Sequence, residues 1–240
     1  TFRRLYTEWF SPLEAVGRTA SRIVVGGDSD YPPYEFLDEH GDPAGFNVDL
    51  TRAIARQMGL SVDFRLAPWG EVRAGLGRGE IDVLQGMFYS TERDRRFDFS
   101  QPYAVIQHVA VVRRGSPQVS DLESLAGRSI VVMDGDIMHD LVVEKRLAAE
   151  VVTVASQEEA LRRLAAGEHD CALVARVPAL YWIETNRWSN LVVSGESLLS
   201  AESCFAVPHG KEPLLSELVE GLAAVKQTGE FRAIQARWLA

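Results

Sequence analysis

Residues 61–84, SVDFRLAPWGEVRAGLGRGEIDVL, and residues 150–173, EVVTVASQEEALRRLAAGEHDCAL, follow one plan. In each stretch a short apolar run precedes a segment of helical periodicity, then Gly-Glu, one variable residue, Asp, and a second apolar run. We interpret them as two versions of one strand–helix–strand unit. Because they lie about ninety positions apart, the sequence predicts two similar α/β lobes, and a cleft between lobes is a favoured place for a small ligand.

Apolar runs alternate with helical segments along most of the remaining chain, which is the pattern of an α/β protein with largely parallel sheets. The clearest helix is expected after Ser156, because Ser156 and Glu159 have capping-box spacing and Gly167 stands where a helix ends. Strands are predicted at 23–27, 61–67, 81–86, 108–114, 129–133, 151–155, 170–175, 190–194 and 204–208.

The composition, with 46% hydrophobic and 25% charged residues in 240, is typical of a globular protein with one large domain or two lobes. The net charge of -9 repels phosphate backbones, so we expect no nucleic-acid partner. No apolar run approaches the roughly 18 residues that span a bilayer, and TFRRLYTEWF at 1–10 lacks the series of a signal peptide. The chain is therefore expected to be cytosolic, a mature secreted form, or a fragment of a longer protein.

Two cysteines, Cys171 and Cys204, each lie in a short apolar run that is typical of a strand. Free buried thiols are therefore favoured over a disulfide. The cysteines do not decide the compartment.

The two ends of the chain resemble each other. TFRRLYTEWF at 1–10 and EFRAIQARWL at 230–239 share Phe, Arg and Trp at matching places, with apolar residues on one helical face. Two interpretations stay open. The likeness is a coincidence between amphipathic helices, or residues 1–20 are a helix and linker that end a preceding similar domain.

Five elements, YPPYEF, GFNVDL, GEID, TER and DFSQPY, occur between residues 31 and 103 in the order and spacing of one family. The chain from about residue 22 to 240 resembles the extracytoplasmic solute-binding proteins of the polar amino-acid type. The resemblance implies the two-lobed periplasmic-binding-protein (Venus flytrap) fold, α/β, with a mixed, mostly parallel sheet in each lobe. Lobe 1 is expected at 21–113 plus 202–240 and lobe 2 at 114–201, with crossings near 112–117 and 196–203.

The same resemblance implies a set of ligand-binding residues. Arg93 is expected to hold a carboxylate of the ligand, because a guanidinium presents a planar fork to such a group. Asp28 is expected to meet a polar ligand group, or else to cap the following turn. Tyr31 and Trp69 are expected as aromatic walls of the cleft, with a place in the core as the alternative. Gly86 is expected to bring backbone close to the ligand.

Departures from the family pattern concern four further positions. Phe88 stands where transporters of this type usually have Thr, so we expect it to give the ligand an apolar surface in place of a hydroxyl contact. The Asp that commonly binds an α-amino group is replaced by Ala175, followed by Arg176, so an ordinary α-amino acid becomes a doubtful ligand. Arg176 is expected either to meet a second anionic group or to be a solvated or hinge-bracing residue. Asp136 is expected as a helix N-cap, or as a group that binds a ligand donor or cation.

Asp136, His139 and Asp140 could suggest a metal site, because residues at i and i+3 share a helix face. Without a further convergent ligand in view, a capped helix with an exposed His is favoured. We therefore expect no metal and no cofactor. The sequence shows no phosphate-binding loop or nucleophile elbow, so no catalytic site is expected in this chain, although a few relatives with this fold are dehydratases.

Two functions compete. GMFYSTER at 86–93 and GDIMHD at 135–140 resemble the sensor regions of bacterial histidine kinases, and the helix-like start without an anchoring Cys also favours a sensor. We expect the periplasmic sensor domain of a two-component histidine kinase, tethered to the inner membrane without being embedded in it. The expected partner is a small carboxylate-bearing or amino-acid-like ligand, and a homodimer stays open. The alternative is the soluble binding protein of an amino-acid-type ABC transporter.

Overall fold

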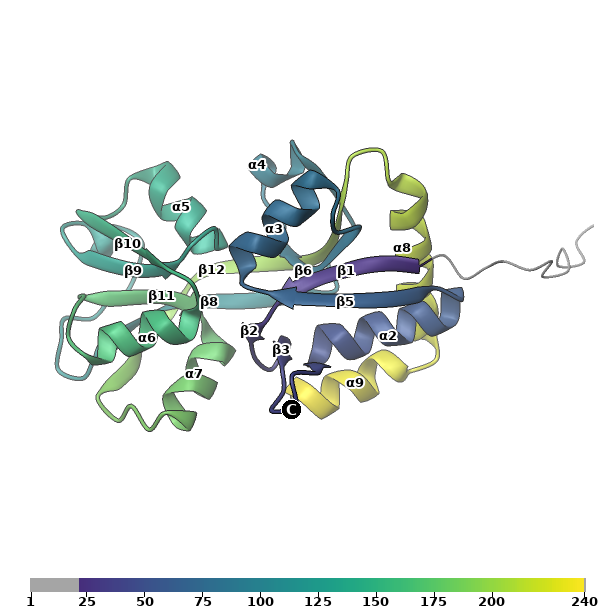
Figure 1. Cartoon of the computed structure of the whole chain (residues 1–240). Helices are drawn as coiled ribbons and strands as arrows, with labels where there is room; N and C mark the ends of the chain where they lie inside the picture. Colours follow the sequence, from purple (N-terminus) through teal and green to yellow (C-terminus); the bar gives the residue numbers. More distant parts are fainter. Residues whose placement is uncertain (1–21, 240) are drawn as a thin grey trace, which may run out of the picture.

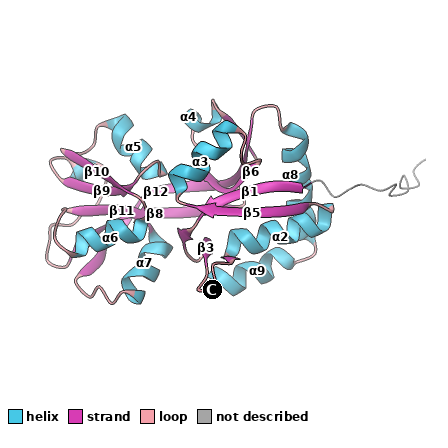
Figure 2. Cartoon of the chain, viewed as in Figure 1, coloured by secondary structure: helices cyan, strands magenta, loops and turns pink. Residues whose placement is uncertain are grey.

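The computed structural model describes residues 22–239, which form two α/β halves on one mixed sheet (Figure 1, Figure 2). The strands are β1 (Arg22–Asp28), β2 (Asp30–Tyr31), β3 (Glu35–Leu37), β4 (Pro43–Ala44), β5 (Ser61–Ala67), β6 (Val83–Phe88), β7 (Phe97–Phe99), β8 (Ala104–Arg113), β9 (Ser129–Met133), β10 (Glu150–Val154), β11 (Cys171–Ala175) and β12 (Leu191–Pro208). The helices are α2 (Phe46–Met58), α3 (Trp69–Arg78), α4 (Thr91–Asp94), η1 (Glu123–Leu125), α5 (Ile137–Lys145), α6 (Gln157–Ala165), α7 (Arg176–Thr185), α8 (Glu212–Gln227) and α9 (Glu230–Leu239).

The large sheet has the order β10-β9-β11-β8-β12-β6-β1-β5, with β7 paired to β12. We call the half with β1, β5 and β6 lobe 1 and the half with β9, β10 and β11 lobe 2. The three strands named for each lobe are parallel, whereas β8, β12 and β7 add antiparallel pairs. Helices cover both faces of the sheet in each lobe (Figure 1). The expected two-lobed fold is therefore confirmed.

The repeated stretches at 61–84 and 150–173 occupy equivalent places. They contain β5-α3-β6 in lobe 1 and β10-α6-β11 in lobe 2, and in each lobe one strand, β1 or β9, lies between the two strands of the repeat. Asp82 Oδ2 accepts a hydrogen bond from the backbone N–H of Val24 at 2.9 Å, and Asp170 Oδ2 accepts one from Ser129 at 2.9 Å. The shared Asp thus ties the repeat to its middle strand in both lobes.

Two strands, β8 and β12, are common to both lobes and join them. The predicted strands 190–194 and 204–208 are the two ends of the single 18-residue strand β12, so the prediction of two separate strands was wrong. The register between β12 and β8 shifts between Ser194 and Leu199. Gly195, with φ of 69°, allows this irregularity without ending the strand. The expected lobe limits at residues 113 and 201 fall at the end of β8 and within β12.

The predicted helix after Ser156 is confirmed as α6. Ser156 Oγ accepts a hydrogen bond from the backbone N–H of Glu159 at 3.2 Å, which satisfies one of the free donors of the first turn. The Glu159 carboxylate accepts from the backbone N–H of Ala155, one residue before the cap, at 3.2 Å. Gly167 has φ of 88° and ends the segment.

Lobe 1 buries an apolar layer between α2, α8 and α9. Phe46 of α2 is fully buried and makes an edge-to-face contact with Phe231 of α9, with ring centroids 5.8 Å apart. Trp238 of α9 donates from Nε1 to Asp49 at 2.9 Å. The expected amphipathic helix at 230–239 is therefore confirmed, whereas the expectations for residues 1–20 lie outside the described residues.

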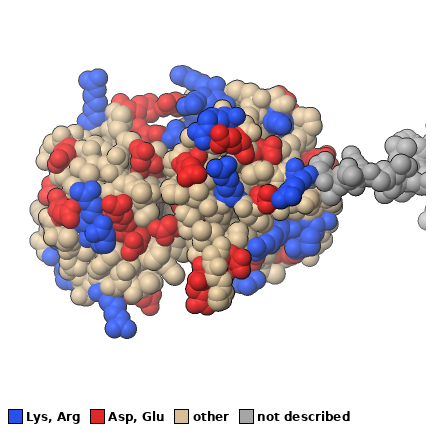
Figure 3. Space-filling view, viewed as in Figure 1, with Lys and Arg blue, Asp and Glu red and all other residues tan. Residues whose placement is uncertain are grey.

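Cys171 and Cys204 are both free and buried, as expected. Within residues 22–239, no helix combines the length and apolar character needed to cross a bilayer. Acidic and basic side chains are interspersed on the face shown in Figure 3.

Candidate ligand-binding site

A small, partly open cavity lies between the lobes. Seven of the eight residues expected at the ligand line this cavity, from segments that the sequence separates by more than one hundred positions. Lobe 1 contributes Asp28, Tyr31, Glu35, Trp69, Gly86, Phe88 and Arg93, and lobe 2 contributes Met133, Asp136 and Ile137.

The carboxyl ends of parallel strands bring the lining residues together. Asp28 is the last residue of β1 and Phe88 the last of β6, while Met133 ends β9 in the other lobe. Trp69 is the first residue of α3, directly after β5. This edge of an α/β sheet is a common ligand-binding edge, because successive strands deliver their following loops to the same place.

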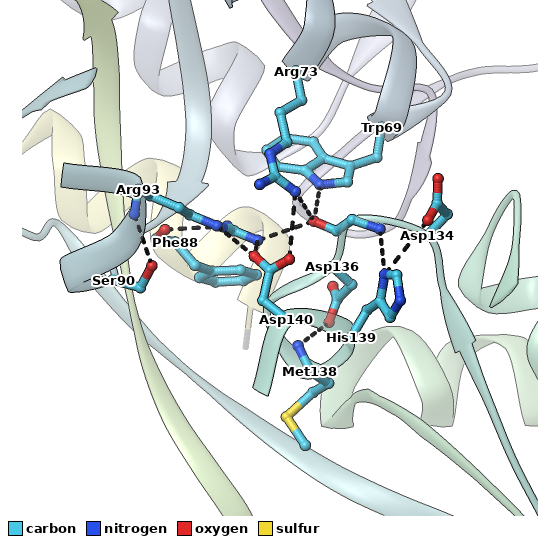
Figure 4. A network of polar contacts seen from close by, with 11 residues as sticks. Trp69, Arg73, Phe88, Ser90, Arg93, Asp134, Asp136, Met138, His139 and Asp140 are labelled. Carbon is cyan, nitrogen blue, oxygen red and sulfur yellow. Dashed lines mark hydrogen bonds and ion pairs between the residues drawn. The ribbon is translucent and has the colours of Figure 1, made fainter. Parts of the chain in front are cut away.

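Arg93 is buried to 2% exposure and is held by groups of the protein (Figure 4). Its Nε and Nη2 donate to Oδ2 of Asp140 at 3.0 and 2.7 Å. Its Nη2 also donates to Gly135 O at 3.0 Å, and its Nη1 donates to Phe88 O at 3.2 Å. The carboxylate that meets Arg93 in this structure is therefore that of Asp140, from α5 of the opposite lobe.

The carbonyl of Gly135 is a second meeting point of the lobes. Trp69 Nε1 donates to this oxygen at 2.8 Å and Arg73 Nη1 at 2.9 Å, next to the bond from Arg93 (Figure 4). Arg73 also lies 3.6 Å from Asp140 Oδ1. Three donors of lobe 1 thus converge on one loop of lobe 2, and we call Trp69, Arg73, Arg93, Gly135 and Asp140 the interlobe latch.

Asp28 caps the turn that follows β1, which is one of the two roles expected from the sequence, and it also lines the cavity. Its Oδ1 caps the following turn by accepting from the backbone N–H of Asp30 at 2.9 Å. Its Oδ2 is buried without a hydrogen-bond partner among the described residues, and the side chain lines the cavity. Burial raises the pKa of Asp28 well above its ordinary value. The hydrogen bond from the backbone of Asp30 lowers this pKa, whereas the negative charges of Glu35, Asp30 and Asp136 raise it further.

Asp136 is the N-cap of α5, as expected, and is 2% exposed. Its Oδ1 accepts a hydrogen bond from the backbone N–H of Met138 at 2.8 Å. The residue also lines the cavity. Asp28 of lobe 1 and Asp136 of lobe 2 therefore both border the cavity, one in each lobe.

Glu35 is a cavity residue that sequence reasoning missed. Its Oε1 accepts from the backbone N–H of Asp28 at 2.9 Å and its Oε2 accepts from Asn47 Nδ2 at 3.0 Å, so the carboxylate braces lobe 1. Burial raises the pKa of Glu35, opposed by its hydrogen bonds. A Cβ at Gly86 would lie 2.6 Å from Asn47 Nδ2 and 3.2 Å from Glu35 Oε1. Gly86 thus leaves room for this bond in addition to lining the cavity.

Aromatic side chains form the remaining wall. Tyr31 meets Phe88 edge to face, with ring centroids 6.5 Å apart, and Phe88 meets His108 at 4.9 Å. The Tyr31 hydroxyl is buried without a hydrogen-bond partner among the described residues. Met133 and Ile137, which the sequence did not single out, add apolar surface from lobe 2. The cavity combines apolar walls with carboxylates.

Residues 23–240 match the family model described as bacterial extracellular solute-binding proteins, family 3. The chain belongs to this family. L-cystine-binding protein TcyJ of Escherichia coli (strain K12) is 27% identical over 218 residues, which cover 90% of this chain and 82% of that protein. Relatives of this kind support an extracytoplasmic solute-binding domain, as expected from the sequence.

Two solved structures are similar to this chain, and their described functions differ. A histidine kinase sensor domain with similarity to periplasmic binding proteins is 45% identical, with a TM-score of 0.89, and the match covers 92% of this chain and 97% of that chain. An ancestral arginine-binding protein bound to arginine is 29% identical, with a TM-score of 0.85, covering 92% and 99%.

Arg176 is the one expected ligand residue of this family 3 domain that does not line the cavity. It is the exposed first residue of α7. The neighbouring Ala175 is buried, and its backbone N–H donates to Gln157 Oε1 at 3.1 Å. Among residues 22–239, no group of three His, Cys, Asp or Glu side chains converges as a metal site.

Proposed function

We propose that this chain is the extracytoplasmic sensor domain of a membrane-attached histidine kinase and binds a small amino-acid-like solute between its lobes. The observation that supports this most directly is the likeness to a histidine kinase sensor domain, at 45% identity over 97% of that chain. The arginine-binding and cystine-binding relatives are 29% and 27% identical.

The cavity supports a mechanism in which ligand stabilises lobe closure. A solute there contacts Asp28 and Phe88 of lobe 1 together with Asp136 of lobe 2. Such a solute binds the closed form more tightly than the open form, and a shift from 1:99 to 99:1 requires roughly 5.5 kcal/mol of differential binding. The C-terminal helix α9 packs on α2 of lobe 1 and would pass the change towards a membrane segment.

The second candidate is the soluble binding protein of an amino-acid-type ABC transporter. It is favoured by the curated relatives, which include a probable amino-acid ABC transporter-binding protein of Haemophilus influenzae, 25% identical over 237 residues. Solute binding between the lobes is common to both candidates.

The reading frame beyond residue 240 distinguishes the sensor domain from the transporter binding protein. A downstream transmembrane helix followed by a kinase region supports the sensor, whereas a stop codon directly after residue 240 contradicts it and favours the transporter protein. For a sensor, autophosphorylation of the full-length protein in membrane vesicles is then expected to change on substitution of Asp28 by Asn. The exposed Asp63→Asn serves as the matched control, because Asp63 pairs with Arg22 on the surface, away from the cavity.

A further inference from the structure

We propose that the cleft of this domain selects a small ligand that carries an ammonium group and no carboxylate. This inference rests on the proposed solute-binding function and names the chemical class of the solute. Its starting point is the partner of Arg93, because the carboxylate at that position is already supplied by Asp140.

A guanidinium has five N–H donors, and the protein uses four of those on Arg93, for Asp140, Gly135 and Phe88. One donor on Nη1 remains. Arg93 therefore cannot offer a free ligand the two parallel bonds by which a guanidinium grips a carboxylate.

A ligand carboxylate would have to displace Asp140. The Arg93 side chain is 1% exposed and that of Asp140 is 25% exposed, so the exchange would replace one short charge-assisted contact by another. It would also remove a bond between the lobes, because Asp140 belongs to lobe 2 and Arg93 to lobe 1. A carboxylate thus gains little at Arg93 and loses part of the interlobe latch.

Two other carboxylates border the cavity with capacity for a ligand. Asp28 is 3% exposed, and its Oδ2 has no hydrogen-bond partner among residues 22–239. Asp136 is 2% exposed and borders the cavity from the other lobe. Glu35 differs from them, because each of its oxygens already accepts a hydrogen bond that braces lobe 1. An ammonium group between Asp28 and Asp136 satisfies the unpartnered oxygen, offsets the repulsion of the two acids and connects the lobes.

The walls suit the same ligand. Tyr31, Trp69 and Phe88 line the cavity, and aromatic faces attract ammonium groups as well as apolar bodies. The cavity between the lobes is small, so it excludes a large solute. A small amine suits both the aromatic walls and the size of the cavity.

Matched pairs of compounds test this specificity, since each pair differs only in the carboxylate. We would titrate the chain with ethanolamine and serine, histamine and histidine, putrescine and ornithine, and tyramine and tyrosine. Thermal shift serves as the screen and isothermal titration calorimetry gives Kd. At least one amine is expected to bind roughly tenfold or more tightly than its parent amino acid, because only the amino acid must displace Asp140.

Substitutions of the cavity carboxylates test where the amine binds. Asp28→Asn and Asp136→Ser each remove one cavity carboxylate, and Ser retains an oxygen for the N-cap of α5. Each variant is expected to weaken amine binding roughly tenfold or more, whereas Asp63→Asn on the surface leaves it unchanged. Asp140→Ala frees the guanidinium and is expected to shift preference towards the amino acid. If the Asp140→Ala variant does not fold, Asp140→Asn is tested in its place, because asparagine keeps the shape of the side chain.

Three outcomes overturn the inference. An amino acid that binds the unaltered chain at least as tightly as its amine shows that a carboxylate displaces Asp140, and the solute-binding function then stands with a different ligand class. If neither Asp28→Asn nor Asp136→Ser changes the Kd of the amine, the amine binds outside the cleft. A failure of every compound also refutes the amine class, while the reading frame beyond residue 240 still decides separately whether the chain is a sensor.

Discussion

Asp140 Oδ2 lies 2.7 Å from Nη2 of Arg93, and this pair connects α5 of lobe 2 to α4 of lobe 1. The sequence predicted that Arg93 meets a carboxylate of a ligand, and the structure provides one from the chain itself. An intramolecular ion pair at this place lets the lobes close without a ligand carboxylate. The latch therefore bears on both stability and ligand choice.

We expect Asp140→Ala to lower the free energy of unfolding by about 3 kcal/mol, because it leaves a buried guanidinium without its counter-charge. Equilibrium unfolding in urea measures this. Asp63→Ala is the matched control, because the Arg22–Asp63 pair has the same kind of short contact, 2.8 Å, with side chains 71% and 53% exposed. An exposed pair is expected to contribute only about 0 to 1 kcal/mol. Equal losses in the two variants would contradict a special role for the buried pair.

Asp30 gives a pH dependence of stability. Burial raises the pKa of Asp30 from 3.8 to about 6. The hydrogen bond with the Ser156 hydroxyl lowers this pKa, and the negative charge of Glu158 raises it. Between about pH 4 and pH 6 the folded chain thus binds more protons at Asp30 than the unfolded chain does. Its contribution to the free energy of unfolding therefore falls as the pH rises through this window.

Asp30→Asn removes this contribution. The difference in unfolding free energy between the original chain and the variant is expected to change across that pH range and to be constant above pH 7. A difference that is independent of pH from 4 to 7 would show that Asp30 titrates normally.

Gly86→Ala is expected to cost about 1 to 3 kcal/mol of stability, because the added methyl group overpacks the site. The new Cβ would lie 2.6 Å from Asn47 Nδ2 and would disturb its bond to Glu35. Gly70→Ala in α3 is the control, because its nearest non-local atom is 3.9 Å away and alanine favours a helix. Urea unfolding of both variants measures the difference, and a tolerated Gly86→Ala would contradict the crowding.

Both cysteines are expected to be inert in the folded chain. Burial raises the pKa of the Cys171 thiol and of the Cys204 thiol to about 12, so the reactive thiolate is scarce at neutral pH. Titration with a thiol-reactive disulfide reagent should give almost no reaction in buffer and two thiols per chain in urea. Rapid labelling of the folded chain would show that one of them is accessible.

Much of the fold follows from local patterns in the sequence. The apolar runs, the capping box at Ser156 and the paired repeats depend on neighbouring residues, and such short-range signals survive in the sequence. The repeat even placed Asp82 and Asp170 in equivalent roles. The continuity of β12 was missed, because the sequence does not show that the backbone conformation of Gly195 absorbs a register shift within one strand.

The sequence predicted some residues of the candidate site and missed others. Family-like motifs named seven cavity residues, because the motifs themselves follow the carboxyl ends of strands. Glu35, Met133 and Ile137 were missed, since a single acid or apolar residue beside a strand has many structural roles.

The sequence by itself determined the two lobes, a cleft between them, and the presence of Arg93 there. Only the tertiary structure decided what Arg93 binds. Arg93 and Asp140 are 47 positions apart and belong to different lobes, so no local spacing connects them. Their contact depends on how the two lobes close, and it is the geometry of closure that brings a carboxylate of lobe 2 to the guanidinium of lobe 1.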